Sequence, residues 1–263
     1  MPWRGRKCQG CEPRSGEAIP YLRFGDCFVA KDAPRNDTRW LVLILPIDGL
    51  HLEYDARAVH IWSDAPLVVV SSAVVGSDLT HARHIINLHV HRDYANRSPH
   101  DDLAAFARAL EIAEPFVGLM TAAKTERAQV AIETDAAMTV IAIATVGISR
   151  PIAAGITPAA NMEVGTINIV VIADARLTQA ARVNAVITAT EAKTLALIER
   201  DVRAPHGGLA SGTGTDSIVI ATTERGAAYE YAGPISPLGA LIARAVRRAI
   251  LNALTAETQR AQS

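Results

Sequence analysis

The sequence has few cysteines, few aromatic residues and no long apolar run, and each shortage narrows the class of protein. Its 3 cysteines among 263 residues are an odd number and fit a reducing compartment better than a disulfide framework. Apolar stretches such as residues 41–46 are far shorter than the roughly 20 residues of a membrane span. No apolar run follows the charged N-terminus, so no signal peptide is expected. We therefore expect a cytoplasmic protein without a membrane segment.

An excess of charge of one sign is also lacking, because 26 Lys and Arg stand against 27 Asp and Glu. This balance gives no general attraction to nucleic acid or to an anionic membrane surface. Hydrophobic residues make up 49% of the chain, which is typical of a globular protein with a substantial core. The expected partner is a small molecule, and the composition leaves a homo-oligomer open.

The pattern of apolar residues predicts an α+β fold, in which a mixed, largely antiparallel sheet is layered with helices. We assign residues 1–38 to an irregular N-terminal extension, 39–255 to the domain and 256–263 to a frayed tail. The expected strands include 40–45, 50–54, 59–62 and 67–71 as a meander, and the expected helices lie near 102–113, 178–200 and 237–254. Residues 122–133 carry a moderate helical pattern.

Two strand-like segments, 165–173 and 214–221, resemble each other, and each leads into an Ala-rich helix. An internal β-to-α duplication would explain this likeness. The abundance of Ala and Val in the chain is the other explanation.

The long helix expected at 178–200 places most of its large apolar residues on one side at 100° per residue. Glu191 and Asn184 fall within that apolar sector and Thr188 borders it, whereas Lys193 falls on the opposite side as a solvated charge. A carboxylate that loses hydration becomes a candidate general acid or base. The alternative is a structural Glu191 that hydrogen-bonds a neighbouring loop.

Small residues and hydroxyl groups alternate in the loop that follows this helix. Ser211, Gly212, Thr213, Gly214 and Thr215 precede Asp216 at the start of a strand. Exposed backbone N–H groups in such a loop can cradle an anion or form an oxyanion hole. The alternative is a tight turn that requires glycine. The loop lacks the lysine of a nucleotide-binding P-loop.

Metal-binding patterns are incomplete. Cys8 and Cys11 form half of a zinc site, but Cys27 is the only other cysteine and the fourth ligand would be a distant histidine. The run His89-x-His91-x-Asp93 would align three ligands on one face of a strand, although exposed histidines on an edge strand are the commoner arrangement. We therefore predict no metal site.

Three stretches together resemble the adenosylcobinamide amidohydrolase family. They read GTINIVVIADARLTQAARVNAVITATEAK, SGTGTDSIVIATT and YEYAGPISPLGALIARAVRRAI, and the likeness is strongest over residues 161–249. The resemblance implies hydrolysis of the amide between the aminopropanol arm and the corrin ring of adenosylcobinamide, which yields adenosylcobyric acid for cobalamin biosynthesis. The corrinoid is then the substrate, and no cofactor is expected.

The patterns and the resemblance together assign roles to individual residues. Glu191 is the predicted general base for water, Asp216 orients its partner or the substrate amide, and a direct nucleophile, Thr213 or Thr215, is the rival mechanism. Residues 211–215 and Asn168, which shares a strand face with Thr166, would supply hydrogen bonds to the oxyanion. The candidate substrate-binding residues are Asn161, Thr166, Asn168, Asn184, Thr188, Ser211, Gly212 and Gly214.

Two alternative functions stay open. Residues 234–237 read Pro-Ile-Ser-Pro where the family tends to have a His-Thr pair, which fits a corrinoid-binding protein with weakened hydrolysis. The second alternative is an unrelated anion-binding α+β enzyme that uses the loop at 211–216.

Overall fold

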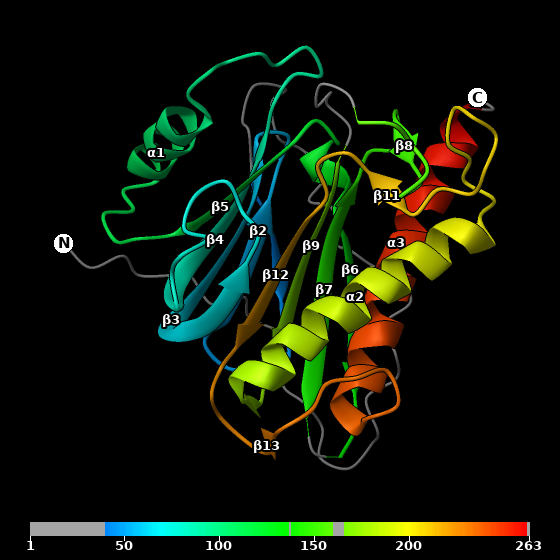
Figure 1. Ribbon diagram of the computed structural model, residues 1–263. Helices are drawn as coiled ribbons and strands as arrows, with labels where there is room; N and C mark the ends of the chain where they lie inside the picture. The colour runs from blue at the N-terminus through cyan, green and yellow to red at the C-terminus, as the bar shows by residue number, and fades with distance from the viewer. Residues whose placement is uncertain (1–39, 137, 160–165, 262–263) are drawn as a thin grey trace, which may run out of the picture. The chain divides into compact units, whose positions relative to one another are not determined.

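The computed structural model describes residues 40–136, 138–159 and 166–261, so the predicted extension at 1–38 lies outside it (Figure 1). A nine-stranded sheet has the order β1-β2-β3-β12-β9-β7-β6, with β4 paired to β3 and β5 paired to β4. The strands are β1 (Leu41–Ile44), β2 (Leu50–Tyr54), β3 (Ala58–Ser71), β4 (His81–His89), β5 (Val117–Thr121), β6 (Gln129–Thr134), β7 (Thr139–Val146), β9 (Ile167–Ala173) and β12 (Ser217–Thr222). Most pairs are antiparallel, and the pairs β4–β5 and β9–β12 are parallel. The predicted α+β class is confirmed.

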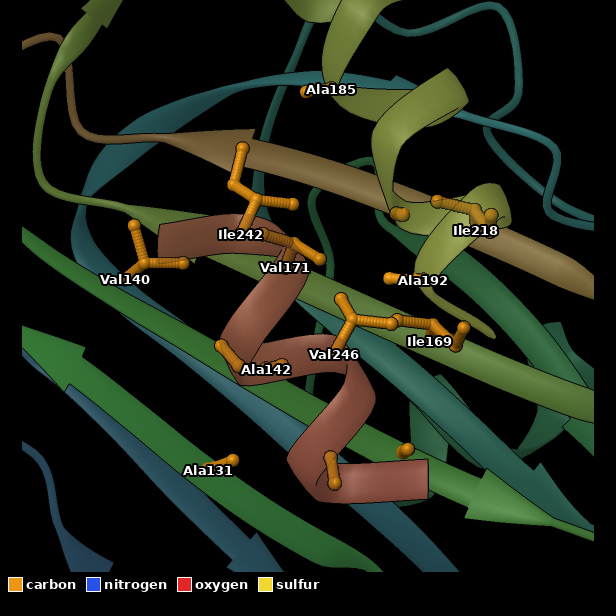
Figure 2. Close-up of a cluster of buried hydrophobic side chains, with 14 of the residues drawn as sticks. Ala131, Val140, Ala142, Ile169, Val171, Ala185, Ala192, Ile218, Ile242 and Val246 are labelled. Carbon is orange, nitrogen blue, oxygen red and sulfur yellow. The ribbon is translucent and has the colours of Figure 1, made fainter. Parts of the chain in front are cut away.

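Helices α2 (Gln179–Glu199) and α3 (Pro237–Ala261) cover one face of this sheet, at the right of Figure 1. Each helix begins at a residue of the type that favours a helix start: the Thr178 hydroxyl accepts from the N–H of Ala181, and Ser236 accepts from the N–H of Gly239. Figure 2 shows the resulting core, in which alanines of α2 and larger side chains of α3 pack on residues of β7, β9 and β12. The predicted helix at 178–200 is confirmed, and the one predicted at 237–254 is present but continues to Ala261, into the segment assigned to a tail.

The other face of the sheet closes on itself. Apolar side chains of β2, β3, β4 and β5 form one cluster with those of β6, β7, β9 and β12, so the sheet is curled around a second core. Helix α1 (Pro99–Ala109) packs outside this curl, where its Leu103 and Ala107 meet Ala58 and Ile86. The curl brings β4 and β5 close to β9, which positions the polar residues described below.

Two local expectations were wrong. The runs at 59–62 and 67–71 belong to one strand, β3, whose register shifts between Trp62 and Leu67, because Pro66 interrupts the hydrogen-bond ladder without ending the strand. Residues 122–133 contain a 3₁₀ turn (Thr125–Arg127) and strand β6 in place of a helix. Pairing of β6 with β7 along its whole length outweighs the local helical pattern.

Two short ribbons complete the described part. Strand β8 (Pro151–Ile152) pairs with β11 (Gly212–Thr213), and β10 (Arg176–Leu177) pairs with β13 (Ala228–Tyr229). None of the helices in the described ranges is both long and apolar enough to cross a membrane.

Candidate active site

The candidate site lies where the parallel strands β9 and β12 begin. Asn168 and Ser217 are register partners, so Thr166 and Asp216, just before the two strands, come to the same edge of the sheet. The ribbon β8–β11 and helix α2 border this edge. Residues 168–173 pair in register with residues 217–222, to which they correspond in the sequence likeness, and this arrangement is consistent with the duplication hypothesis, which stays a prediction.

The carboxylate of Asp216 accepts hydrogen bonds from several groups at this edge. Its Oδ2 forms an ion pair with Lys193 Nζ. Its Oδ1 accepts from the Thr213 hydroxyl at 2.5 Å and from the N–H of Ile167 at 3.1 Å, and the N–H of Thr213 lies 3.2 Å from both oxygens. One carboxylate thus connects α2, the loop at 211–215 and β9. We call Lys193, Thr213, Asp216, Thr166 and Asn168 the polar cluster.

Lys193 was predicted to be a solvated charge, and this prediction was wrong. The residue is 6% exposed and lies on the buried face of α2 among its alanines. The error follows from weighting large apolar side chains, since the buried face of α2 consists mainly of alanines, while Val183, Ile187, Leu195 and Ile198 are exposed. A buried ammonium requires a partner of opposite charge, which Asp216 provides.

Gly212 lies where the ion pair passes. A Cβ at this position would lie 2.7 Å from Lys193 Nζ and would overlap Asp216 Oδ2. The absence of a side chain at Gly212 therefore allows Lys193 and Asp216 to approach each other closely. Gly214 differs, because a Cβ there would meet no atom within 4 Å.

Asn168 is buried at the centre of a second group of polar side chains. Its Nδ2 donates to Asn87 Oδ1 and to the Met120 carbonyl, both at 2.8 Å, and its Oδ1 accepts from the Thr166 hydroxyl at 3.0 Å. Asn87 donates in turn to the Thr145 hydroxyl at 2.9 Å. Both N–H bonds of the Asn168 amide are engaged, so in this arrangement Asn168 holds Thr166 and has no donor left for an oxyanion.

Asn87 and Thr145 were not among the predicted site residues. Both are buried in strands, and the sequence signal for Asn87 is a lone amide within the apolar run Ile-Ile-Asn-Leu. A buried amide must be hydrogen-bonded, so such a residue marks a polar contact between strands.

Glu191 does not join the polar cluster. It is exposed on α2, so the predicted burial in an apolar sector was wrong. Two residues correspond to 200° of helical rotation, which turns Glu191 away from Lys193. Glu191 lines a groove of about 480 Å³ between α2 and α3. The general-base role rested on the predicted burial and loses that basis.

The other predicted substrate-binding residues are scattered. Thr188 is buried and donates to the Ala232 carbonyl at 2.7 Å, and Asn184 is half-buried on α2. The Ser211 hydroxyl accepts from the N–H of Ala154 at 2.9 Å. The Thr166 hydroxyl has one proton, which it shares between Asn168 Oδ1 and the Thr215 carbonyl at 2.8 Å. Asn161 lies outside the described residues.

The Asp216 carboxylate occupies part of the anion site that was predicted for the loop at 211–215. The N–H of Thr213, which was expected to face a bound anion, points at the Asp216 carboxylate. The loop is therefore consistent with the tight-turn alternative as well as with an anion-binding loop, because its backbone folds around the Asp216 carboxylate.

Metal ligation finds no support in the described ranges, where no three His, Cys, Asp or Glu side chains are grouped to hold a metal ion. His89 Nδ1 lies 3.0 Å from the Ala123 carbonyl, and His91 pairs with Asp93 at 3.3 Å in an exposed position. The cysteines at positions 8, 11 and 27 lie outside the described residues.

The polar cluster contains the groups that acyl transfer needs. A hydroxyl that donates to a carboxylate is a nucleophile next to a base, and Thr213 with Asp216 has this geometry. An ammonium group carries three N–H donors, of which the described residues engage one, through Asp216 Oδ2. The remaining donors of Lys193 are suited to a developing oxyanion.

Comparison with known proteins gives a family match over most of the chain. The model of the adenosylcobinamide amidohydrolase family matches residues 46–262. An adenosylcobinamide amidohydrolase of Methanosarcina mazei is 33% identical over 176 residues, which are 64% of this chain and 80% of that protein. The uncharacterised protein MJ1613 of Methanocaldococcus jannaschii is 45% identical over 94 residues, and the match spans only 36% of its length and 35% of this chain.

Solved structures are more distant. The PH0078 protein of Pyrococcus horikoshii OT3 has a TM-score of 0.46 at 16% identity, over 82% of this chain and 83% of that one. A beta-aminopeptidase of Burkholderia sp. has a TM-score of 0.44 at 15% identity, over 82% of both chains. Neither similarity informs the roles of the residues above.

Proposed function

The chain belongs to the adenosylcobinamide amidohydrolase family, and from this premise we propose that it hydrolyses the aminopropanol amide of adenosylcobinamide. The products would be adenosylcobyric acid and aminopropanol, and the reaction would return salvaged corrinoids to cobalamin biosynthesis. In this proposal the corrinoid is a substrate, and the reaction uses amino-acid side chains without a cofactor.

The observation that carries the proposal is the buried Lys193–Asp216 ion pair in contact with the Thr213 hydroxyl. Burial of two charges is unfavourable unless they are closely paired and hydrogen-bonded, and a pair of this kind is a weak source of stability. Its weak contribution to stability favours a chemical role over a purely structural one.

The geometry favours a threonine nucleophile over the water mechanism based on Glu191. The Thr213 oxygen would attack the amide carbonyl while its proton passes to Asp216, and Lys193 would stabilise the tetrahedral oxyanion. Collapse of the tetrahedral intermediate would break the C–N bond, with the proton transferred from Asp216 to the leaving amine. Water would then hydrolyse the cobyric-acyl ester, regenerating Thr213.

Incubation of the purified chain with adenosylcobinamide, followed by mass spectrometry, tests the function. The expected result is adenosylcobyric acid that accumulates with time. Tight corrinoid binding without any product would identify the weakened binding protein and overturn hydrolysis.

Intact-protein mass spectrometry tests the nucleophile. Rapid quenching should reveal a covalent cobyric-acyl adduct that is absent in Thr213→Val. Thr190→Val is the matched control, because the Thr190 hydroxyl is exposed and donates to its own helix at Val186. An adduct that persists in Thr213→Val would assign the nucleophile to another residue.

A further inference from the structure

Helix α2 exposes four of its large apolar side chains, while Leu197 is buried. Val183, Ile187, Leu195 and Ile198 are 47%, 48%, 58% and 40% exposed, whereas Ala181, Ala185, Ala189, Ala192 and Ala196 of the same helix are buried. An amphipathic helix on a protein surface ordinarily turns its large apolar residues towards the core. A helix that buries small residues on the sheet and keeps a stripe of large ones outside has a second apolar face.

The stripe continues into the groove between α2 and α3. Leu195, Ala243, Leu251 and Pro234 line this groove of about 480 Å³. The loop before α3 is fixed beside it, because the Thr188 hydroxyl donates to the Ala232 carbonyl. Two more exposed apolar side chains lie on that loop, Tyr231 at 67% and Ile235 at 101% exposure. Exposed apolar side chains gathered on neighbouring elements in this way mark an interaction site.

Charges of both signs lie unbalanced in the same groove. Glu191 lines the groove and makes no ion pair with any described residue. Arg244 and Arg248 both pair with the single carboxylate of Glu133, and Arg200 donates to the Thr255 hydroxyl. The groove therefore holds one unpaired negative charge beside an excess of positive charge.

We infer that the outer face of α2 and the α2–α3 groove form an interface between two copies of this chain, related by a two-fold axis. A two-fold interface places the same surface on both sides, so each Glu191 can pair with an arginine of the other copy. An anionic partner would pair with the arginines but would leave Glu191 facing like charge. The apolar stripe supplies the area that the association buries.

Light scattering coupled to size-exclusion chromatography of the full chain tests the interface. The expected mass is about 56 kDa, twice the 28.0 kDa of one chain. Ile187→Glu and Leu195→Glu should each weaken association by at least about tenfold, since each buries a charge in an apolar contact. Ile44→Glu is the control, because Ile44 is 97% exposed on β1, away from this surface, and this variant should stay dimeric.

Charge reversal tests the pairing across the interface. Glu191→Arg alone and Arg244→Glu alone should both be monomeric, and an equimolar mixture of the two should restore a dimer. Circular dichroism should show that each variant is folded. A wild-type chain that stays at 28.0 kDa over all concentrations overturns the interface. A dimer that survives Ile187→Glu and Leu195→Glu overturns it as well, because it must use another surface.

Discussion

Lys193 and Glu191 stand two positions apart on α2 and meet different surroundings. Lys193 contacts Asp216 inside the protein, and Glu191 faces the groove on the outer side of the helix. The angular difference of 200° makes it impossible for both side chains to serve one site. Lys193, which the ion pair holds beside Thr213, is therefore better placed for the chemistry than Glu191.

Gly212→Ala tests this contact at the residue scale. The added Cβ would force Lys193 Nζ away from Asp216, so the rate of amide hydrolysis should fall by at least about tenfold. The free energy of unfolding should fall by about 1–3 kcal/mol, as for other overpacked sites. Gly214→Ala, which meets open space, should change the free energy of unfolding by less than about 0.5 kcal/mol. Equal activity in the two variants would show that the ion pair is not part of the active site.

The sequence predicted the loop residues Gly212, Thr213 and Asp216 because their types carry a local signal. It could not predict Lys193 or Asn87, since their burial depends on contacts far along the chain. Asn87 and Asn168 meet across 81 positions, and Lys193 meets Asp216 across 23. Periodicity ranks side chains by hydrophobicity, and a lysine whose partner lies in another element is assigned to the solvent.

At the scale of elements, the strands and helices with strong patterns were predicted well. Helix α2 and strand β2 were placed within a residue of their observed bounds. Strand β6 was missed because its pattern is weak and its strand form depends on pairing with β7. The face of α2 was reversed because alanine allows the close packing on the sheet and on α3 that larger residues would prevent.

Strands β2, β3 and β4 also carry a chain of hydrogen-bonded titratable groups outside the candidate site. His60 lies 3.2 Å from Glu53 and 3.0 Å from His84, which lies 3.1 Å from Glu114. Burial, together with the charge of His84, lowers the pKa of His60 to about 4. Burial raises the pKa of Glu53. The neutral form of His60 is therefore favoured in the folded protein.

The pKa of His60 predicts a loss of stability in acid. Protonation of a histidine whose folded pKa lies below 6.5 favours the unfolded chain, so its stabilising effect is complete above about pH 6.5 and decreases towards about pH 4. The free energy of unfolding should change by up to about 1.4 kcal/mol per pH unit in this window. The raised pKa of Glu53 opposes this change at the acidic end. Urea unfolding gives the free energy of unfolding at each pH. The values for wild type and for His60→Gln should approach each other as the pH falls through this window. His81→Gln, at an exposed position, is the control, and parallel curves for His60→Gln would contradict the prediction.

At the scale of the whole molecule, the curl of the sheet and the crossover through α2 assemble the site. The curl brings Asn87 and the Met120 carbonyl to Asn168, and α2 connects the parallel strands β9 and β12 while carrying Lys193. The proposed dimer would contact the outer face of the same helix, opposite Lys193. One chain supplies every residue of the polar cluster, so under the proposed function loss of the dimer should leave the chemistry in place.

The central claim is that the buried ion pair, and not the exposed Glu191, carries hydrolysis. It is tested most directly by the rate of adenosylcobyric acid formation in Asp216→Asn and in Glu191→Gln, each shown to be folded. Loss of the carboxylate at Asp216 should lower the rate by about 10²–10⁴-fold. Glu191→Gln should stay within about twofold of wild type. A collapse of activity in Glu191→Gln, with near wild-type turnover in Asp216→Asn, would contradict the account.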